Sequence, residues 1–77
     1  MKLATTEDIY AVLPANLRLL RKRKGMSQTL FAAHLRIGMK AYAKHEEGKS
    51  QPPIRVCLAI CQVGGVSLED LLTKKLK

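Results

Sequence analysis

The sequence predicts an all-α fold: a compact bundle of five helices, with a short extra N-terminal helix as an open alternative. Apolar residues make up 47% of the 77-residue chain, enough for the core of one small domain. Aromatic residues are few, so the core must consist mostly of Leu, Ile, Val and Ala, which suit packed helices better than a sheet. Glycine and proline separate apolar stretches whose lengths fit short helices.

The first proline is expected to interrupt the N-terminal helical region. A threonine and two acids at residues 6–8 can cap a short helix through Leu13, because acidic side chains stabilise a helix N-terminus. A proline disfavours helical geometry at the residue before it, so we expect a break or kink at Leu13 and a new helix over residues 14–24. The chain then divides into an N-terminal extension, residues 1–13, and a domain, residues 14–77.

Four more helices follow, each with signals for its start or end. Ser27 and Ser67 are suited to cap helix N-termini. Gly48 and the two prolines at 52 and 53 mark the turn between the helix that ends near residue 47 and the one that starts at residue 54. The stretch "IRVCLAICQV" is apolar on most sides, as a buried helix would be. The expected helices cover residues 28–35, 39–47, 54–63 and 68–77.

The charge balance indicates the class of partner. Fourteen Lys and Arg against six Asp and Glu give a net charge of +8, which favours nucleic acid or an anionic membrane surface. The alternative is a basic surface with no partner. No apolar run approaches the roughly 20 residues needed to span a bilayer, and the first residues lack the apolar centre of a signal peptide. We therefore expect a cytosolic protein with reduced cysteines.

Residues 27–47 have the pattern of a helix-turn-helix. Two short helices joined by a three-residue turn cannot bury themselves alone, so they must pack on each other and on flanking helices. With Gln28 as the first position, the motif requires a small residue at the fifth, and Ala32 is there. It also requires apolar residues at the fourth, eighth, tenth and fifteenth positions, which are Phe31, Leu35, Ile37 and Tyr42.

Four short segments extend this pattern: "LRLLRKRKGMSQ", "FAAHLRI", "HEEGKSQP" and "VSLEDLL". In their order and spacing they resemble the Xre family, the DNA-binding domains of lambda-type phage repressors and Cro proteins. The resemblance covers residues 14–72 and implies a lambda-repressor-like fold that binds double-stranded DNA. It also implies that the second helix of the motif lies in the major groove. We expect no cofactor.

That second helix, which starts at Met39, is expected to carry a cationic face. Tyr42 and His45 point inward at helical spacing, while Arg36, Lys40 and Lys44 are four residues apart and form a stripe along one side. The alternative is that these cations are only a solvated face.

Base contacts are expected from the same face. Lysine can donate to guanine O6 and N7, while Met39 and Ala43 can touch a thymine methyl group. Lys40, with Met39 and Lys44, also matches the positions from which members of the family contact bases.

Phosphate contacts are expected from residues on both sides of this helix. Gln28 lies at a helix N-terminus, where free N–H groups suit an anion, and the resemblance implies that it holds the DNA backbone. Lys49, Ser50 and Gln51 form a candidate second phosphate clamp. Basic residues 22–24 are expected to add a general field.

The resemblance also implies an ion pair between Arg21 and Glu46, which would tie the first long helix to the end of the recognition helix. The alternative is two independent surface charges.

The chain departs from the family at two positions. Arg36 stands where members usually have a left-handed glycine, at a cost of about 1 kcal/mol. Either Arg36 accepts this strain and gains a phosphate contact, or Gly38 takes up the turn. His45 stands where an aliphatic residue is usual; we expect a partly buried ring with a satisfied nitrogen, with a pH sensor as the alternative.

Zinc binding and catalysis are not indicated. Cys57 and Cys61 lie one turn apart in a single predicted helix, whereas His34 and His45 lie on different helices, so no recognised zinc spacing is met. The cysteines are expected to be small buried hydrophobes. No nucleophile has a plausible base, and no glycine-rich phosphate loop occurs.

From these expectations we predict that the protein is a sequence-specific regulator, most simply a repressor that binds a pseudo-palindromic operator as a homodimer. The C-terminal leucines would supply the self-contact, extended by Leu3, Ile9 and Val12. The rival is an antitoxin that binds a toxin partner and autoregulates through DNA. The four C-terminal contact residues are Leu68, Leu71, Leu72 and Leu76.

Overall fold

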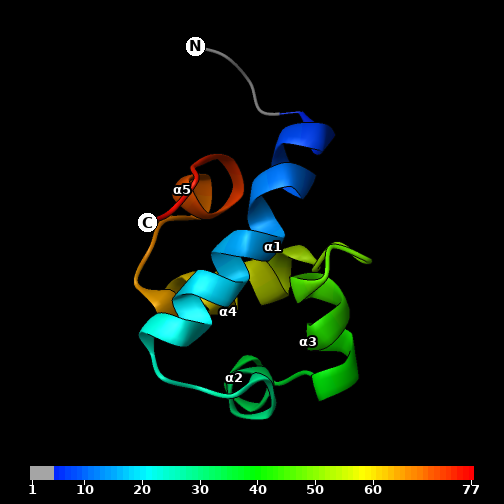
Figure 1. Ribbon diagram of the computed structural model, residues 1–77, viewed down its shortest axis with the longest axis vertical. Coiled ribbons are helices and arrows are strands. Elements are labelled where there is room, and N and C mark those ends of the chain that lie inside the picture. Colours follow the sequence, from blue (N-terminus) through cyan, green and yellow to red (C-terminus); the bar gives the residue numbers. More distant parts are fainter. Residues whose placement is uncertain (1–4) are drawn as a thin grey trace.

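The protein is a bundle of five helices (Figure 1). The structure, a computed structural model, describes residues 5–77 apart from the side chains of residues 6, 8, 9 and 10. No strand occurs in this part of the chain, so the all-α prediction is confirmed. The helices are α1 Thr6–Arg23, α2 Gln28–Leu35, α3 Met39–Glu46, α4 Ile54–Gly64 and α5 Leu68–Thr73.

Helix α1 corrects the first sequence expectation, because it runs without a break through Pro14. A proline inside a helix costs about 3 kcal/mol through a lost hydrogen bond and a clash with the preceding turn. Packing on both sides offsets this cost: Leu13 and Leu17 are almost completely buried. The proline ring also rests on the backbone of Gly48, where an added Cβ would lie 3.3 Å from Pro14 Cγ. Residues 6–13 of the predicted extension therefore belong to α1.

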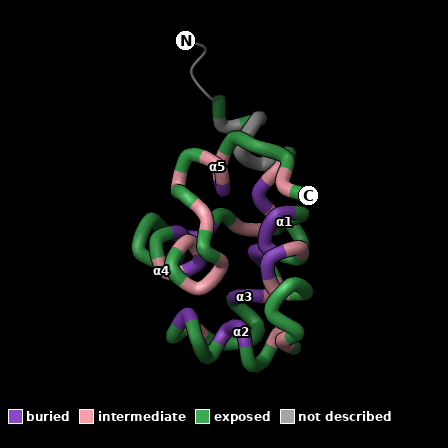
Figure 2. The backbone as a smooth tube through the Cα atoms, turned by 90° about the vertical axis from the view of Figure 1, so that its left-hand side faces the viewer, coloured by how far each residue is buried: buried purple, intermediate pink, exposed green. Residues whose placement is uncertain are grey.

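The core lies where all five helices face one another. In Figure 1, α1 crosses the molecule with α5 on one side, α3 on the other and α4 behind it. Figure 2 shows buried and exposed stretches alternating along the helices, as expected when each turns one face to a shared core. Phe31 of α2 and Tyr42 of α3 meet edge to face at its centre, with ring centroids 5.4 Å apart. Both rings are completely buried.

Helix α4 is less buried than its sequence suggests. Val56, Cys57 and Ile60 face the core, but Ile54 and Leu58 are 61% and 48% exposed. The prediction of a helix buried on most sides is wrong, because the neighbouring helices cover only one face of α4 in so small a bundle.

Helix α5 is shorter than predicted, since it ends at Thr73 and Lys74 has extended backbone angles. The cause is Asn16 of α1, which is buried. Its amide nitrogen donates to the carbonyl oxygens of Leu71 and Lys74, each at 2.8 Å, and its oxygen accepts from the backbone N–H of Leu76 at 3.1 Å. These bonds hold residues 74–77 in an extended path against α1 instead of a further helical turn.

One leucine of the expected self-contact belongs to the core of the protomer itself. Leu71 is completely buried, so it is not available to a second copy. Leu68, Leu72 and Leu76 are half-buried against the same core. Leu3 lies outside the described residues, as does the side chain of Ile9.

Replacing Asn16 with alanine should destabilise the fold by about 3 kcal/mol, because the carbonyls of Leu71 and Lys74 and the N–H of Leu76 lose their partner. Chemical denaturation would measure the loss, and amide exchange at Leu76 should become faster. Thr73→Ala is the control, since it removes only an exposed side-chain bond to the carbonyl of Glu69. Unchanged stability of Asn16→Ala with a still protected Leu76 amide would contradict this role.

Candidate nucleic-acid interface

The turn between α2 and α3 shows which residue takes the left-handed conformation that a glycine usually adopts. Arg36 adopts the left-handed conformation, with φ 59° and ψ 43°. Its N–H donates to the carbonyl of Ala33, and that of Ile37 donates to the carbonyl of Ala32, which closes the end of α2. Gly38 has ordinary extended angles and only precedes α3. The strain is therefore taken by Arg36, and α3 begins at Met39 as expected.

Arg36 is the one residue other than glycine that has a positive φ in the described part of the chain. Gly25, Gly48 and Gly65 are the other residues with positive φ in the described part of the chain. A side chain in the left-handed region costs about 1 kcal/mol relative to glycine. The turn therefore stores strain that a glycine would have avoided.

Helix α3 presents one side to the core and the other to solvent. Tyr42 is completely buried and His45 is 8% exposed, which fixes the inner face. Met39, Lys40 and Lys44 are exposed on the rest of the helix, and Ala43 is half-buried. Helix α3 therefore packs against the core with one side and carries two lysines, one turn apart, on its exposed side.

Arg36 does not continue this lysine row. It lies outside α3, and its side chain lines a groove of about 610 Å³ between the end of α2 and α4. The helical spacing that predicted a stripe of three cations applies only from Met39 onward, so it relates Lys40 to Lys44 and does not extend to Arg36. The groove also contains Arg55 and the exposed Ile54 and Leu58. Sequence reasoning missed it, because α4 alone shows no sign of which face stays open.

The recognition helix is held in place by Arg21 and Glu46. Arg21 Nε and Nη2 donate to the two oxygens of Glu46, each at 2.9 Å, which is a bidentate pair. Arg21 Nη1 also donates to the carbonyl of Met26. Glu46 is 4% exposed, so the pair is largely removed from water. The structure thus brings together the two residues that the resemblance pairs.

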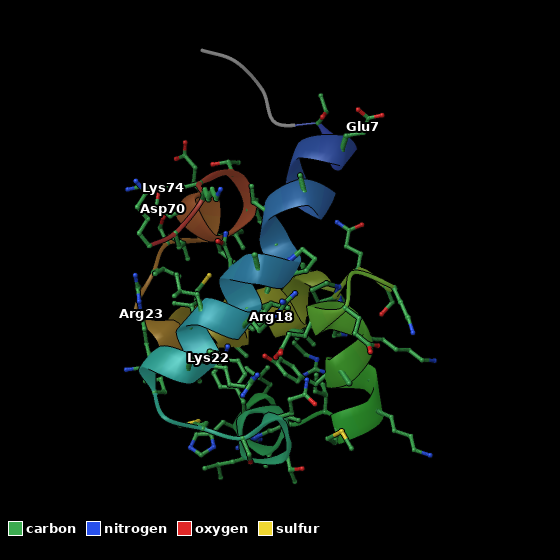
Figure 3. The ribbon with its side chains drawn as sticks, viewed as in Figure 1. Glu7, Arg18, Lys22, Arg23, Asp70 and Lys74 are labelled. Atoms are coloured by element: carbon green, nitrogen blue, oxygen red, sulfur yellow. The ribbon has the colours of Figure 1, made fainter. Side chains whose placement is uncertain are left out.

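Two further side chains donate hydrogen bonds to Glu46. Gln28 Nε2 at the start of α2 donates to Glu46 Oε1 at 3.3 Å. Arg18 of α1 donates to the Glu46 carbonyl at 3.3 Å, and Figure 3 shows its side chain where α1 passes α3. Glu46 therefore links α1, α2 and α3. In Figure 3 Arg23 lies on the side of the molecule away from α3, which suits a general field better than a direct contact.

The electrostatics of this cluster keep Glu46 charged. Burial alone would raise the pKa of Glu46, but the hydrogen bonds from Arg21 and Gln28, the nearby Tyr42 hydroxyl and the charge of Arg21 together outweigh burial, and the pKa is lowered. The same hydrogen bond raises the pKa of Arg21. Burial raises the pKa of Tyr42, whose hydroxyl lies beside the pair but meets hydrogen-bond geometry with none of the described residues.

The candidate phosphate clamp follows α3 directly. Lys49 and Gln51 are exposed, and the Lys49 ammonium lies 3.6 Å from a carboxylate oxygen of the exposed Glu47. Ser50 is half-buried, with both its hydroxyl and its carbonyl close to Nδ1 of His45. The ring nitrogen of His45 therefore has a partner, as expected, and the ring is more deeply buried than the partly buried one expected.

Comparisons with known proteins identify the architecture. The model of a helix-turn-helix family matches residues 17–71. The chain belongs to this helix-turn-helix family. The match and the fold place it among DNA-binding transcriptional regulators of the Xre type. A search of curated proteins finds no match.

A solved structure of similar shape agrees with this assignment. The helix-turn-helix chain is similar to the crystal structure of a hypothetical transcription factor, NHTF, from Neisseria, with a TM-score of 0.76 and 26% identity. The similarity covers 94% of this chain and 83% of that one. No helix within residues 5–77 is long and apolar enough to cross a membrane.

Relieving the strain in the helix-turn-helix should stabilise the protein. Arg36→Gly is expected to raise the free energy of unfolding by about 1 kcal/mol. Gly38→Ala is a matched control in the same turn, because φ is ordinary there and an added Cβ would meet no atom within 4 Å. Urea denaturation would measure both. A loss of stability in Arg36→Gly would show that its side chain contributes more than the strain costs.

The buried carboxylate should make stability pH-dependent. Because the pKa of Glu46 is below its ordinary 4.5 in the folded state, its contribution is fully present above pH 4.5 and is lost as pH falls through the folded value. Glu46→Gln should lower stability at neutral pH by about 3 kcal/mol. The difference between parent and variant should shrink on acidification below pH 4.5. A difference that stays constant with pH would mean that Glu46 gains nothing from its charge.

Proposed function

We propose that the protein is a sequence-specific repressor that binds a pseudo-palindromic operator as a homodimer, with α3 in the major groove. The observation that carries the proposal is the outward cationic side of α3, set on a helix that the Arg21–Glu46 pair holds in place. A helix fixed at its end can present side chains to bases at a defined angle. Repression would be steric, through occupation of a promoter.

Base reading is assigned to the outer face of α3. Lys40 and Lys44 would donate to guanine O6 and N7, while Met39 and Ala43 would contact thymine methyl groups. Met39 is 42% exposed although it is apolar, which fits a residue that is covered only when DNA is bound.

Phosphate contacts are assigned to residues around α3. Gln28 gives one amide hydrogen to Glu46, which fixes the side chain and leaves the second hydrogen to donate to a phosphate. Lys49, Ser50 and Gln51 would hold the backbone on the other side. Arg36 was expected among these contacts, but it borders the groove beside α4, and we do not assign it to DNA.

Dimerisation would give the protein the affinity that it needs to bind an operator. Two copies place their recognition helices about 34 Å apart, on successive major grooves of one duplex face. We assign the self-contact to α5 and the tail, where Leu68, Leu72 and Leu76 are only half-buried in the protomer; Val12 is half-buried as well. Such a regulator would act in the cytoplasm, with the nucleoid, and would need no cofactor and no catalytic step.

A second candidate is an antitoxin that binds a toxin partner. The groove beside α4 favours it: Ile54 and Leu58 are exposed there between Arg36 and Arg55, and no acid lines it. A helix of a partner protein that carries both acidic and apolar side chains would complement these residues. A neighbouring toxin-like reading frame, together with co-purification that Leu58→Asp abolishes, would favour this candidate over a simple repressor.

Selection of bound sites from random duplex DNA tests the main proposal. We expect enrichment of two half-sites related by a two-fold axis. Lys40→Ala should weaken binding to the selected site by about tenfold per half-site without changing the thermal midpoint. Arg21→Ala should lower both the affinity and the midpoint, because Glu46 loses its partner. No enrichment of any site, or equal midpoints for the two variants, would contradict the proposal.

A further inference from the structure

The end of α3 and the candidate phosphate clamp are joined by the side chain of His45, for which sequence reasoning predicted no role in DNA contact. His45 Nδ1 lies 2.9 Å from the hydroxyl oxygen of Ser50 and 3.1 Å from its carbonyl oxygen. His45 is 8% exposed, whereas Ser50 is half-buried and still reaches the surface. The imidazole therefore contacts the clamp from the protein side.

The backbone brings the two residues together. The N–H of Gly48 donates to the carbonyl of His45, and that of Lys49 donates to the carbonyl of Lys44, which folds the chain back against the last turn of α3. Gly48 has φ 75°, a value that glycine adopts without strain. Ser50 is thus held near the imidazole by main-chain bonds that do not depend on either side chain.

The two acceptors at this nitrogen decide where its proton lies. A carbonyl oxygen can only accept, so a hydrogen bond between His45 Nδ1 and the Ser50 carbonyl requires a hydrogen on Nδ1. The Ser50 hydroxyl oxygen, on the same nitrogen, must then accept as well. Its own hydrogen is not used by His45 and can point away from the protein. With the hydrogen on Nε2 alone, Nδ1 would instead take the Ser50 hydroxyl hydrogen and face the carbonyl lone pairs.

We propose that His45 is a positioning residue for DNA backbone contact: its Nδ1–H holds Ser50 so that the serine hydroxyl donates its hydrogen to a phosphate oxygen. The inference rests on the proposed function, because it requires a duplex against α3. An aliphatic residue at position 45 would fill the same space but leave the hydroxyl free to rotate. A histidine here therefore orients a contact outside the core as well as packing within it.

The test compares two replacements of His45 that share a branched shape but differ in hydrogen bonding. His45→Asn can place an amide N–H near the position of Nδ1, whereas His45→Leu cannot donate. The probe is a duplex of random sequence, because phosphate contacts act on any sequence. We expect Ser50→Ala and His45→Leu each to weaken binding by about tenfold, and His45→Asn to bind within about twofold of the parent.

A double-mutant cycle separates positioning from a structural role. If His45 acts through Ser50, the variant with both His45→Leu and Ser50→Ala should bind about as well as either single variant. When the selected site replaces the random duplex, Lys40→Ala should add its own full loss to each of them. Nitrogen-15 NMR of the imidazole should show hydrogen on Nδ1 in the free protein.

Three results would overturn the inference: losses from His45→Leu and Ser50→Ala that multiply, equal losses from His45→Asn and His45→Leu, or an unprotonated Nδ1. A parent protein that does not bind the random duplex at low salt would instead overturn the proposed function. The two failures are therefore distinguishable.

Discussion

The bidentate bond between Arg21 and Glu46 is the constraint on which the presentation of α3 depends. The two residues lie 25 positions apart in the chain and come from two different helices, α1 and α3. Apolar packing defines which face of a helix is buried, but it tolerates sliding and rotation. Two parallel hydrogen bonds at a buried carboxylate also fix the orientation of α3 relative to α1. Because Gln28 and Arg18 bond to the same residue, three helices share one reference point.

A second polar anchor lies on α1 five residues before Arg21. Asn16 uses its amide group to bind the end of α5 and the extended tail, so a helix that propensity would have continued stops at Thr73. Both anchors are on α1, one for the recognition helix and one for the C-terminus. A 77-residue chain buries little apolar surface, and such bonds make one arrangement of short helices preferable to its alternatives.

Departures from local preference gather around the proposed DNA-binding surface. Arg36 accepts a left-handed backbone that glycine adopts elsewhere in the chain, and Tyr42 buries its hydroxyl without a hydrogen bond among the described residues. His45 places an imidazole where an apolar side chain would suffice for packing. Residues that depart from the usual backbone, burial or hydrogen-bond preferences are found most often at functional sites. Arg36, at the strained turn before α3, also borders the groove beside α4.

The sequence alone determined the order of the helices, the bounds of α2 and the start of α3, and the resemblance to a family implied the pairing of Arg21 with Glu46. Those features follow from caps, periodicity and motif spacing, which are local or shared with a family. The continuity of α1 through Pro14, the end of α5 at Thr73 and the exposure of Ile54 were decided by tertiary structure. Each depends on partners distant in the chain: the Gly48 backbone beside Pro14, the Asn16 amide at the end of α5, and the lack of a covering helix over one face of α4. No pattern within a single segment records what packs against it, so these features became visible only when the helices were assembled.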